Sequence, residues 1–139
     1  MLFFDASALV KRYVAEPETA RVTRMLTRGH AAVCRLTEVE ISSALSRRRH
    51  DGLLGPGEHE SALGWLQADL ARLEVVEIDR HVVNRTHGLL ARHRLRAADA
   101  LQLAACLVLR DAVDPEIVLV SYDTRLNVAA RAEGLTVEP

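Results

Sequence analysis

Short apolar runs alternate with longer helical stretches along the whole chain, and this alternation limits the fold more than any other feature of the sequence. Apolar runs of this length, bounded by turn residues or helix starts, are typical of buried strands. Strands that alternate with helices form a mainly parallel sheet with helices on both faces. Residues 1–139 contain no repeat or linker, so we expect a single α/β domain whose five strands are residues 1–5, 31–34, 75–78, 117–121 and 135–137.

Capping residues predict where several helices begin and end. Residues 16–19 combine a proline with acids in the manner of a first helical turn, and Gly29 is placed to end that helix. Thr37, followed three residues later by Glu40, matches a capping box. Asp79 is predicted to be the N-cap of a later helix.

The charge balance excludes a strongly basic nucleic-acid-binding module. The chain has 18 Lys and Arg against 19 Asp and Glu, so any phosphate binding is expected to be local. Cys34 and Cys106 lie in apolar runs and are expected to be buried free thiols, not disulfide or zinc ligands. No apolar stretch is long enough to cross a membrane, and Asp5 interrupts the only candidate signal sequence. We therefore expect a cytoplasmic protein.

Two acids stand at equivalent places after two predicted strands. Asp5 follows the first strand and Asp123 follows the fourth, and each precedes a helix. Taken singly, each is explained as a helix N-cap. Taken together, they leave the carboxyl ends of parallel strands, which is where open α/β sheets bind ligands.

Two further acids lie on predicted helices. Residues 97–109 are almost wholly apolar, and Asp99 and Gln102 are their only polar side chains, three residues apart on one helix face. Asp99 either serves the helix N-terminus or faces a polar cavity that contains positive charge, because an unpaired buried charge is costly. Glu38 and Glu40 flank the apolar stripe of an earlier helix from opposite sides, and helical spacing does not choose between them.

Convergence of these acids would favour a bound cation. Two like charges about 5 Å apart repel by roughly 3 kcal/mol at an effective dielectric constant of 20. Oxygen ligands without nearby His or Cys select Mg²⁺ or Mn²⁺ rather than zinc. An oxygen-ligated Mg²⁺ with open positions is suited to phosphoryl transfer.

Four segments together resemble the PIN-domain ribonucleases, and among these the VapC-type toxins of bacterial toxin–antitoxin pairs. They are MLFFDASALVKRYVAE, LTEVEISSALSRR, RAADALQLAACL and LVSYDTRLNVAA, which extend from the first residues to about Ala130. The resemblance implies a three-layer α/β/α domain around a central parallel sheet. It also implies a Mg²⁺- or Mn²⁺-dependent endonuclease that cuts single-stranded RNA, forms a homodimer and binds a cognate antitoxin.

The resemblance also assigns the site residues. The four family acids correspond to Asp5, Glu40, Asp99 and Asp123, which chooses Glu40 over Glu38. Asp5, Asp99 and Asp123 are then the expected metal ligands, and Glu40 orients or deprotonates the attacking water or holds a second metal. The family hydroxyls correspond to Ser7 and Ser121, which are expected to support the acids without holding the metal themselves. Where some relatives carry a further acid, this chain has Asn127, so no fifth ligand is expected.

Other functions fit the residues less well. A haloacid-type phosphatase requires Asp-x-Asp after its first strand, whereas this chain has Ser7 two residues after Asp5. A receiver domain requires a lysine late in the chain, whereas Lys11 is the only lysine. A catalytically inactive PIN-fold binding module and a PIN nuclease outside a toxin–antitoxin system remain as alternatives. For the arginines, Arg125 and Arg12 are candidates for RNA backbone contacts, with simple solvation as the competing interpretation.

Overall fold

The central sheet has five parallel strands in the order β3-β2-β1-β4-β5. The computed structural model describes all residues from 1 to 139. The five predicted strands are confirmed, with bounds β1 Leu2–Phe4, β2 Ala31–Cys34, β3 Glu74–Val76, β4 Val118–Val120 and β5 Thr136–Glu138. The chain builds outward from β1 to one side and then returns to place β4 on the other side. The strand order therefore reverses at β1, and the carboxyl edge beside β1 and β4 is the expected ligand-binding position.

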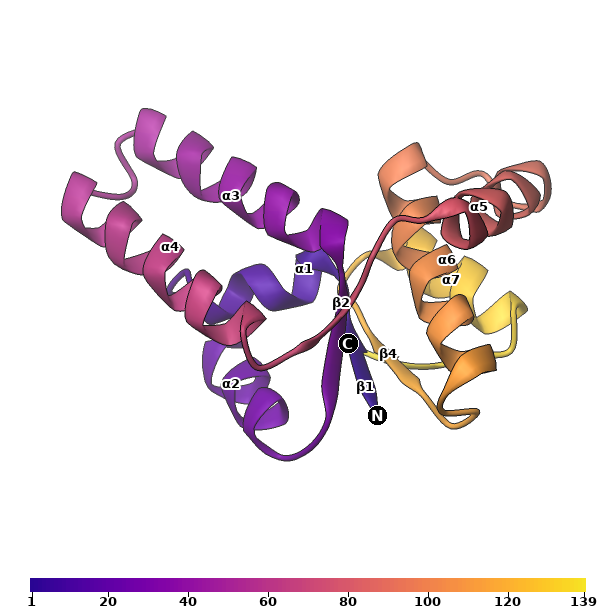
Figure 1. Ribbon diagram of the computed structural model, residues 1–139. Helices are drawn as coiled ribbons and strands as arrows, with labels where there is room; N and C mark the ends of the chain where they lie inside the picture. The colour runs from indigo at the N-terminus through magenta and orange to yellow at the C-terminus, as the bar shows by residue number, and fades with distance from the viewer.

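Helices cover both faces of this sheet. Figure 1 shows α1 to α4 on one side and α5 to α7 on the other, as expected for three α/β/α layers. The helices are α1 Ala6–Leu9, α2 Thr19–Thr27, α3 Arg35–His50, α4 Pro56–Leu70, α5 Arg80–Arg92, α6 Ala97–Ala112 and α7 Thr124–Ala132, with a 3₁₀ turn, η1 Val10–Arg12, after α1. None of these helices combines the length and apolar character needed to cross a membrane.

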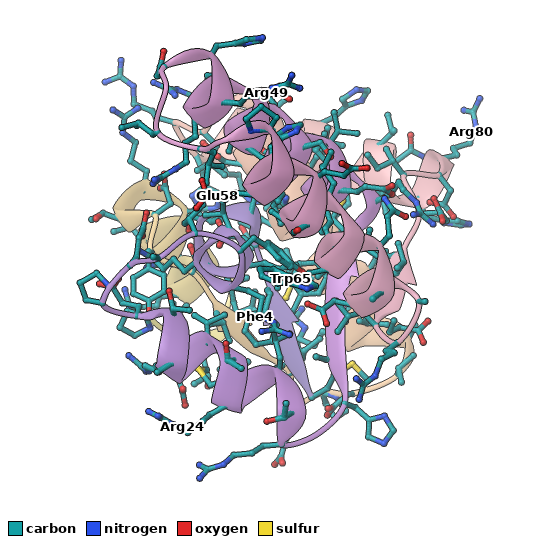
Figure 2. All side chains as sticks on the ribbon, turned by 90° about the vertical axis from the view of Figure 1, so that its left-hand side faces the viewer. Phe4, Arg24, Arg49, Glu58, Trp65 and Arg80 are labelled. Carbon is teal, nitrogen blue, oxygen red and sulfur yellow. The ribbon has the colours of Figure 1, made fainter.

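Strand alternation gives each face its own apolar core. Phe3 and Phe4 are adjacent on β1 and fully buried, and they point to opposite faces of the sheet. Phe3 belongs to the core under α5, α6 and α7, and Phe4 belongs to the core under α1 to α4. Figure 2 shows the side of the sheet that α1 to α4 cover. There, Phe4 lies on the strand behind α4, and Trp65 lies on that helix. The central strand is thus held from both faces, which gives the residues that follow it a firm position.

Two predicted helix starts are wrong. α3 begins at Arg35, directly after β2, so the capping box of Thr37 and Glu40 does not form. The side chains of Thr37 and Glu40 instead contact α6, because tertiary partners replace the local cap. α2 begins only at Thr19, with no acid in its first turn. The reason is that Glu16 and Glu18 turn back to bind the ammonium group of Lys11, at 2.7 and 3.2 Å.

Glycine and Asp79 account for the remaining predicted helix ends. Gly29 does not adopt a left-handed cap, and α2 ends at Thr27. A left-handed glycine does follow α7, where Gly134 has a φ of 81°. The predicted N-cap of α5 is confirmed, since Asp79 Oδ1 accepts a hydrogen bond from the backbone N–H of Val82 at 3.0 Å.

Candidate active site

Asp5 and Asp123 leave the same edge of the sheet from neighbouring strands. β1 and β4 are parallel and in register, with Phe4 opposite Val120. The backbone N–H of Asp5 donates to the carbonyl of Val120 at 3.2 Å, which continues the ladder by one residue. Asp123 follows β4 after two intervening residues. The sheet therefore carries both carboxylates to its carboxyl edge, as their positions in the sequence predicted.

Both acids also serve as N-caps. Asp5 Oδ1 accepts from the backbone N–H of Ala8 at 3.1 Å, at the start of α1. Asp123 Oδ1 accepts from the backbone N–H of Leu126 at 2.8 Å, at the start of α7. The capping role and a role in a site are thus compatible, because capping fixes the orientation of each carboxylate at the sheet edge.

Two serine hydroxyls connect the ends of β1 and β4. Ser7 Oγ donates to Asp5 Oδ1 at 2.8 Å and accepts from the backbone N–H of Tyr122 at 2.9 Å. Ser121 Oγ accepts from the backbone N–H of Asp123 at 3.1 Å. These bonds use the hydroxyl as donor and acceptor at once, so Ser7 joins the Asp5 carboxylate to the segment that carries Asp123.

Asn127 supports the same segment from α7. Its Nδ2 donates to the carbonyl oxygen of Ser121 at 2.9 Å, and the side chain is buried. Its Oδ1 is also buried and has no hydrogen-bond partner. Asn127 therefore holds the end of β4 in place behind Asp123. The sequence indicated only that Asn127 replaces a further acid, and did not predict this structural role.

Glu40 reaches the site through a contact between α3 and α6. Gln102 is only 2% exposed, and its Nε2 donates to Glu40 Oε2 at 2.7 Å and to Thr37 Oγ1 at 2.9 Å. Glu38 points elsewhere, because its carboxylate binds Arg35 at 2.9 Å and Gln67 at 3.0 Å. Glu40 rather than Glu38 is therefore directed towards the helix that carries Asp99. The sequence had marked Gln102 only as a polar residue on an apolar helix.

Burial and mutual repulsion act on the carboxylates. Burial raises the pKa of Asp5 to about 6, although hydrogen bonds led by that of Ser7 oppose this change. Burial also raises the pKa of Glu40, and the negative charge of Asp99 adds to that effect. The pKa of Asp99 is raised by burial and by the charge of Asp123. Negative charge therefore links Glu40 to Asp99 and Asp99 to Asp123, whereas burial alone disfavours ionisation of Asp5.

The oxygen atoms of the four acids suit a divalent ion, although the side chains are not close together. No three His, Cys, Asp or Glu side chains are gathered closely enough to hold a metal ion. The chemistry of the set nevertheless fits Mg²⁺ or Mn²⁺, because all four donors are carboxylates. Mg²⁺ usually keeps several water ligands and needs only one or two protein carboxylates, so a wide acidic site is compatible with it.

Comparison with known proteins identifies the family and agrees with the fold. The family model of the PIN domain matches residues 2–132. Ribonuclease VapC46 of Mycobacterium tuberculosis is 35% identical over 137 residues, covering 98% of this chain and 95% of the relative. Mycobacterium tuberculosis VapC20, described as a sarcin-ricin loop cleaving toxin, superposes with a TM-score of 0.68 at 16% identity, covering 93% of this chain and 95% of that one. DNA-bound VapBC from Salmonella typhimurium also gives 0.68, at 17% identity and coverages of 99% and 96%. The predicted three-layer PIN-like fold is confirmed, and the chain belongs to the PIN-domain family, among the VapC ribonucleases.

Proposed function

We propose that this chain is a Mg²⁺-dependent endoribonuclease that cleaves single-stranded RNA as the toxin of a toxin–antitoxin pair, with residues 1–139 acting as one domain. The observation that carries the proposal is the group of acids at the carboxyl edge of β1 and β4, where the strand order reverses. Carboxylates from separate parts of the chain face this edge, and burial or repulsion raises the pKa of three of them, Asp5, Glu40 and Asp99, a cost that a cation would reduce. Relatives named as ribonucleases, of nearly the same length, support the reaction class.

Each acid has a distinct role in the proposed reaction. Asp5, Asp99 and Asp123 would hold Mg²⁺ or Mn²⁺, which when bound shields the phosphate charge and acidifies water. Glu40, held by Gln102, orients the attacking water and accepts its proton. In-line attack on phosphorus forms a new P–O bond and breaks the bond to the 3′ oxygen. The products carry a 5′-phosphate and a 3′-hydroxyl.

The hydroxyls and backbone contacts keep this arrangement in place. Ser7 and Ser121 bind the carboxylate of Asp5 and the backbone of Asp123, respectively, and so resist separation of the two acids. A scissile phosphate requires its ligands to be positioned within fractions of an ångström for efficient in-line attack. These serines therefore act by positioning the acids, without contacting the RNA.

A protein antitoxin is the proposed partner. Solved structures with the same fold include a toxin–antitoxin complex from Klebsiella pneumoniae and VapBC from Salmonella typhimurium. An acidic site that lacks a cation attracts a basic side chain, so an antitoxin can inhibit by inserting one. We also propose a homodimer, and a cytoplasmic location in which the chain meets both RNA and antitoxin.

Replacement of one carboxylate by its amide tests the reaction. Asp99→Asn is expected to abolish Mg²⁺-dependent RNA cleavage and the growth arrest caused by expressing the chain alone. Asp51→Asn is the matched control, because Asp51 is exposed and its side chain forms no ion pair. Cleavage by Asp99→Asn at the rate of the unchanged protein would overturn the proposed site.

A catalytically inactive binding module is the second candidate. The wide spacing of the acids favours it, since no preformed three-residue metal site is present. Thermal unfolding with and without Mg²⁺ separates the two functions. A metal-dependent nuclease gains stability with Mg²⁺ by mass action, whereas an inactive module that does not bind the ion shows the same Tm in both conditions.

A further inference from the structure

A positively charged groove lies next to the acidic site. Its volume is about 840 Å³, and its lining comes from the end of α5, the connection to α6, and α7. Three arginines line it, namely Arg94, Arg96 and Arg125, together with the exposed apolar side chains of Leu90 and Val128. No acidic residue lines the groove.

The three groove arginines are available for a ligand. Each of them is exposed, and none forms an ion pair within the chain. Glu133, whose carboxylate contacts the groove residue His93 at 2.7 Å, is already paired with Arg92 at 3.0 Å. The groove therefore carries a local positive charge in a chain whose net charge is −1.

The groove lies beside the segments that carry two of the proposed catalytic acids. Arg96 is the N-cap residue of α6, three positions before Asp99, and Arg125 lies in the first turn of α7, two positions after Asp123. Thr124 and Arg125, which line the groove, directly follow Asp123, so the groove borders the segments that carry two of the proposed catalytic acids.

We propose that the Arg94–Arg96–Arg125 groove binds the sugar–phosphate backbone of the RNA strand on one side of the bond to be cut. This inference rests on the proposed function and names the surface that positions its substrate. A polyanionic strand is repelled by an acidic site, so neighbouring guanidinium groups must supply the attraction. Guanidinium forks match phosphate oxygens, and Leu90 and Val128 offer apolar surface to riboses or bases.

A nucleic acid fits this groove better than a second protein surface does. Three unpaired guanidinium groups would be costly to bury in a protein interface unless the partner supplied three acids. Phosphates of one extended strand recur at regular intervals and supply such acids without a specific sequence. The proposal therefore predicts binding that is sensitive to salt and insensitive to base identity.

Equilibrium binding without divalent ions tests the groove separately from cleavage. The probe is a fluorescent oligouridylate of about ten nucleotides, titrated in EDTA at several salt concentrations. Arg94→Gln and Arg96→Gln are each expected to raise the Kd roughly tenfold and to reduce the slope of log K against log salt by about 0.7. Cleavage at saturating RNA should keep its kcat while KM rises. Arg80→Gln and Arg131→Gln are matched controls, since both arginines are exposed, unpaired and outside the groove; Figure 2 shows Arg80 pointing away from the molecule.

The outcomes distinguish the groove from the nuclease. If the unchanged protein cleaves RNA but the groove variants bind and depend on salt like the controls, the groove assignment is wrong and the proposed function stands. If cleavage is absent but the groove variants still bind more weakly than the controls, the groove stands and the nuclease falls. Molar mass from light scattering covers the remaining case. A groove variant that changes the mass of the protein, with no change in RNA affinity, would identify an interface between copies and overturn the proposal.

Discussion

Asp5→Asn is expected to stabilise the metal-free protein while destroying its activity. Asp5 is 4% exposed, and burial raises its pKa from an ordinary 3.8 to about 6. The difference corresponds to about 3 kcal/mol of unfavourable free energy for the ionised native state. Asparagine has the same shape and keeps a side-chain oxygen for Ser7 and Ala8, but it carries no charge to bury.

The sign of the pH dependence follows from proton binding. Between pH 3.8 and about 6, the native state holds a proton on Asp5 that the unfolded state has released. Stability of the unchanged protein therefore falls as pH rises through this window, and the full penalty is present above it. Asp5→Asn removes this contribution, so its stability advantage should approach about 3 kcal/mol at pH 8 and vanish near pH 3.5.

Urea unfolding in EDTA at a series of pH values measures the effect, with Asp51→Asn as the exposed control. Added Mg²⁺ should then stabilise the unchanged protein more than Asp5→Asn, because the variant has lost one of the three proposed ligands. A variant that is less stable than the unchanged protein at pH 8, or an advantage that does not vary with pH, would refute the argument from burial.

Two further substitutions separate positioning from folding. Gln102→Leu removes the donor to Glu40 Oε2 and should lower kcat by about tenfold or more. Urea unfolding should show that the free energy of unfolding falls by roughly 1–3 kcal/mol, because the side chains of Thr37 and Glu40 lose their hydrogen-bond partner. An unchanged kcat would show that Gln102 does not position Glu40 for catalysis. Asp79→Ala deletes the N-cap of α5 and should cost about 1 kcal/mol of stability without altering RNA cleavage per folded molecule, as the denaturation midpoint and kcat together would report.

Local patterns in the sequence were sufficient to predict the sheet and the acids at its edge. All five strands appear near their predicted positions, because short apolar runs have few alternatives to burial in a parallel sheet. Asp5 and Asp123 were predictable as neighbours because each lies within three residues after a strand and parallel strands end at one edge. Helix capping at Asp79 was predictable for the same reason, since it depends on adjacent residues only.

Contacts between distant segments were not predictable from those patterns. Thr37 and Glu40 match a capping box by spacing, yet their side chains bind Gln102, which is 65 and 62 residues away. The choice between Glu38 and Glu40 likewise depends on packing of α3 against α6. The open spacing of the four acids is also a tertiary property, because the positions of four separate elements determine it.

The hydrogen bond from Tyr122 N–H to Ser7 Oγ has a consequence for synthesis of the chain. Its partners are 115 residues apart, and β4 is one of the last strands to be translated although it lies beside the first. At 5–20 residues per second, a ribosome needs roughly 6–23 seconds to make the residues between them. During that interval Asp5 has no neighbouring Asp123, so a nascent chain cannot assemble the acidic site. An RNA-cutting protein with this strand order can complete the proposed acidic site only after β4 and Asp123 have been translated.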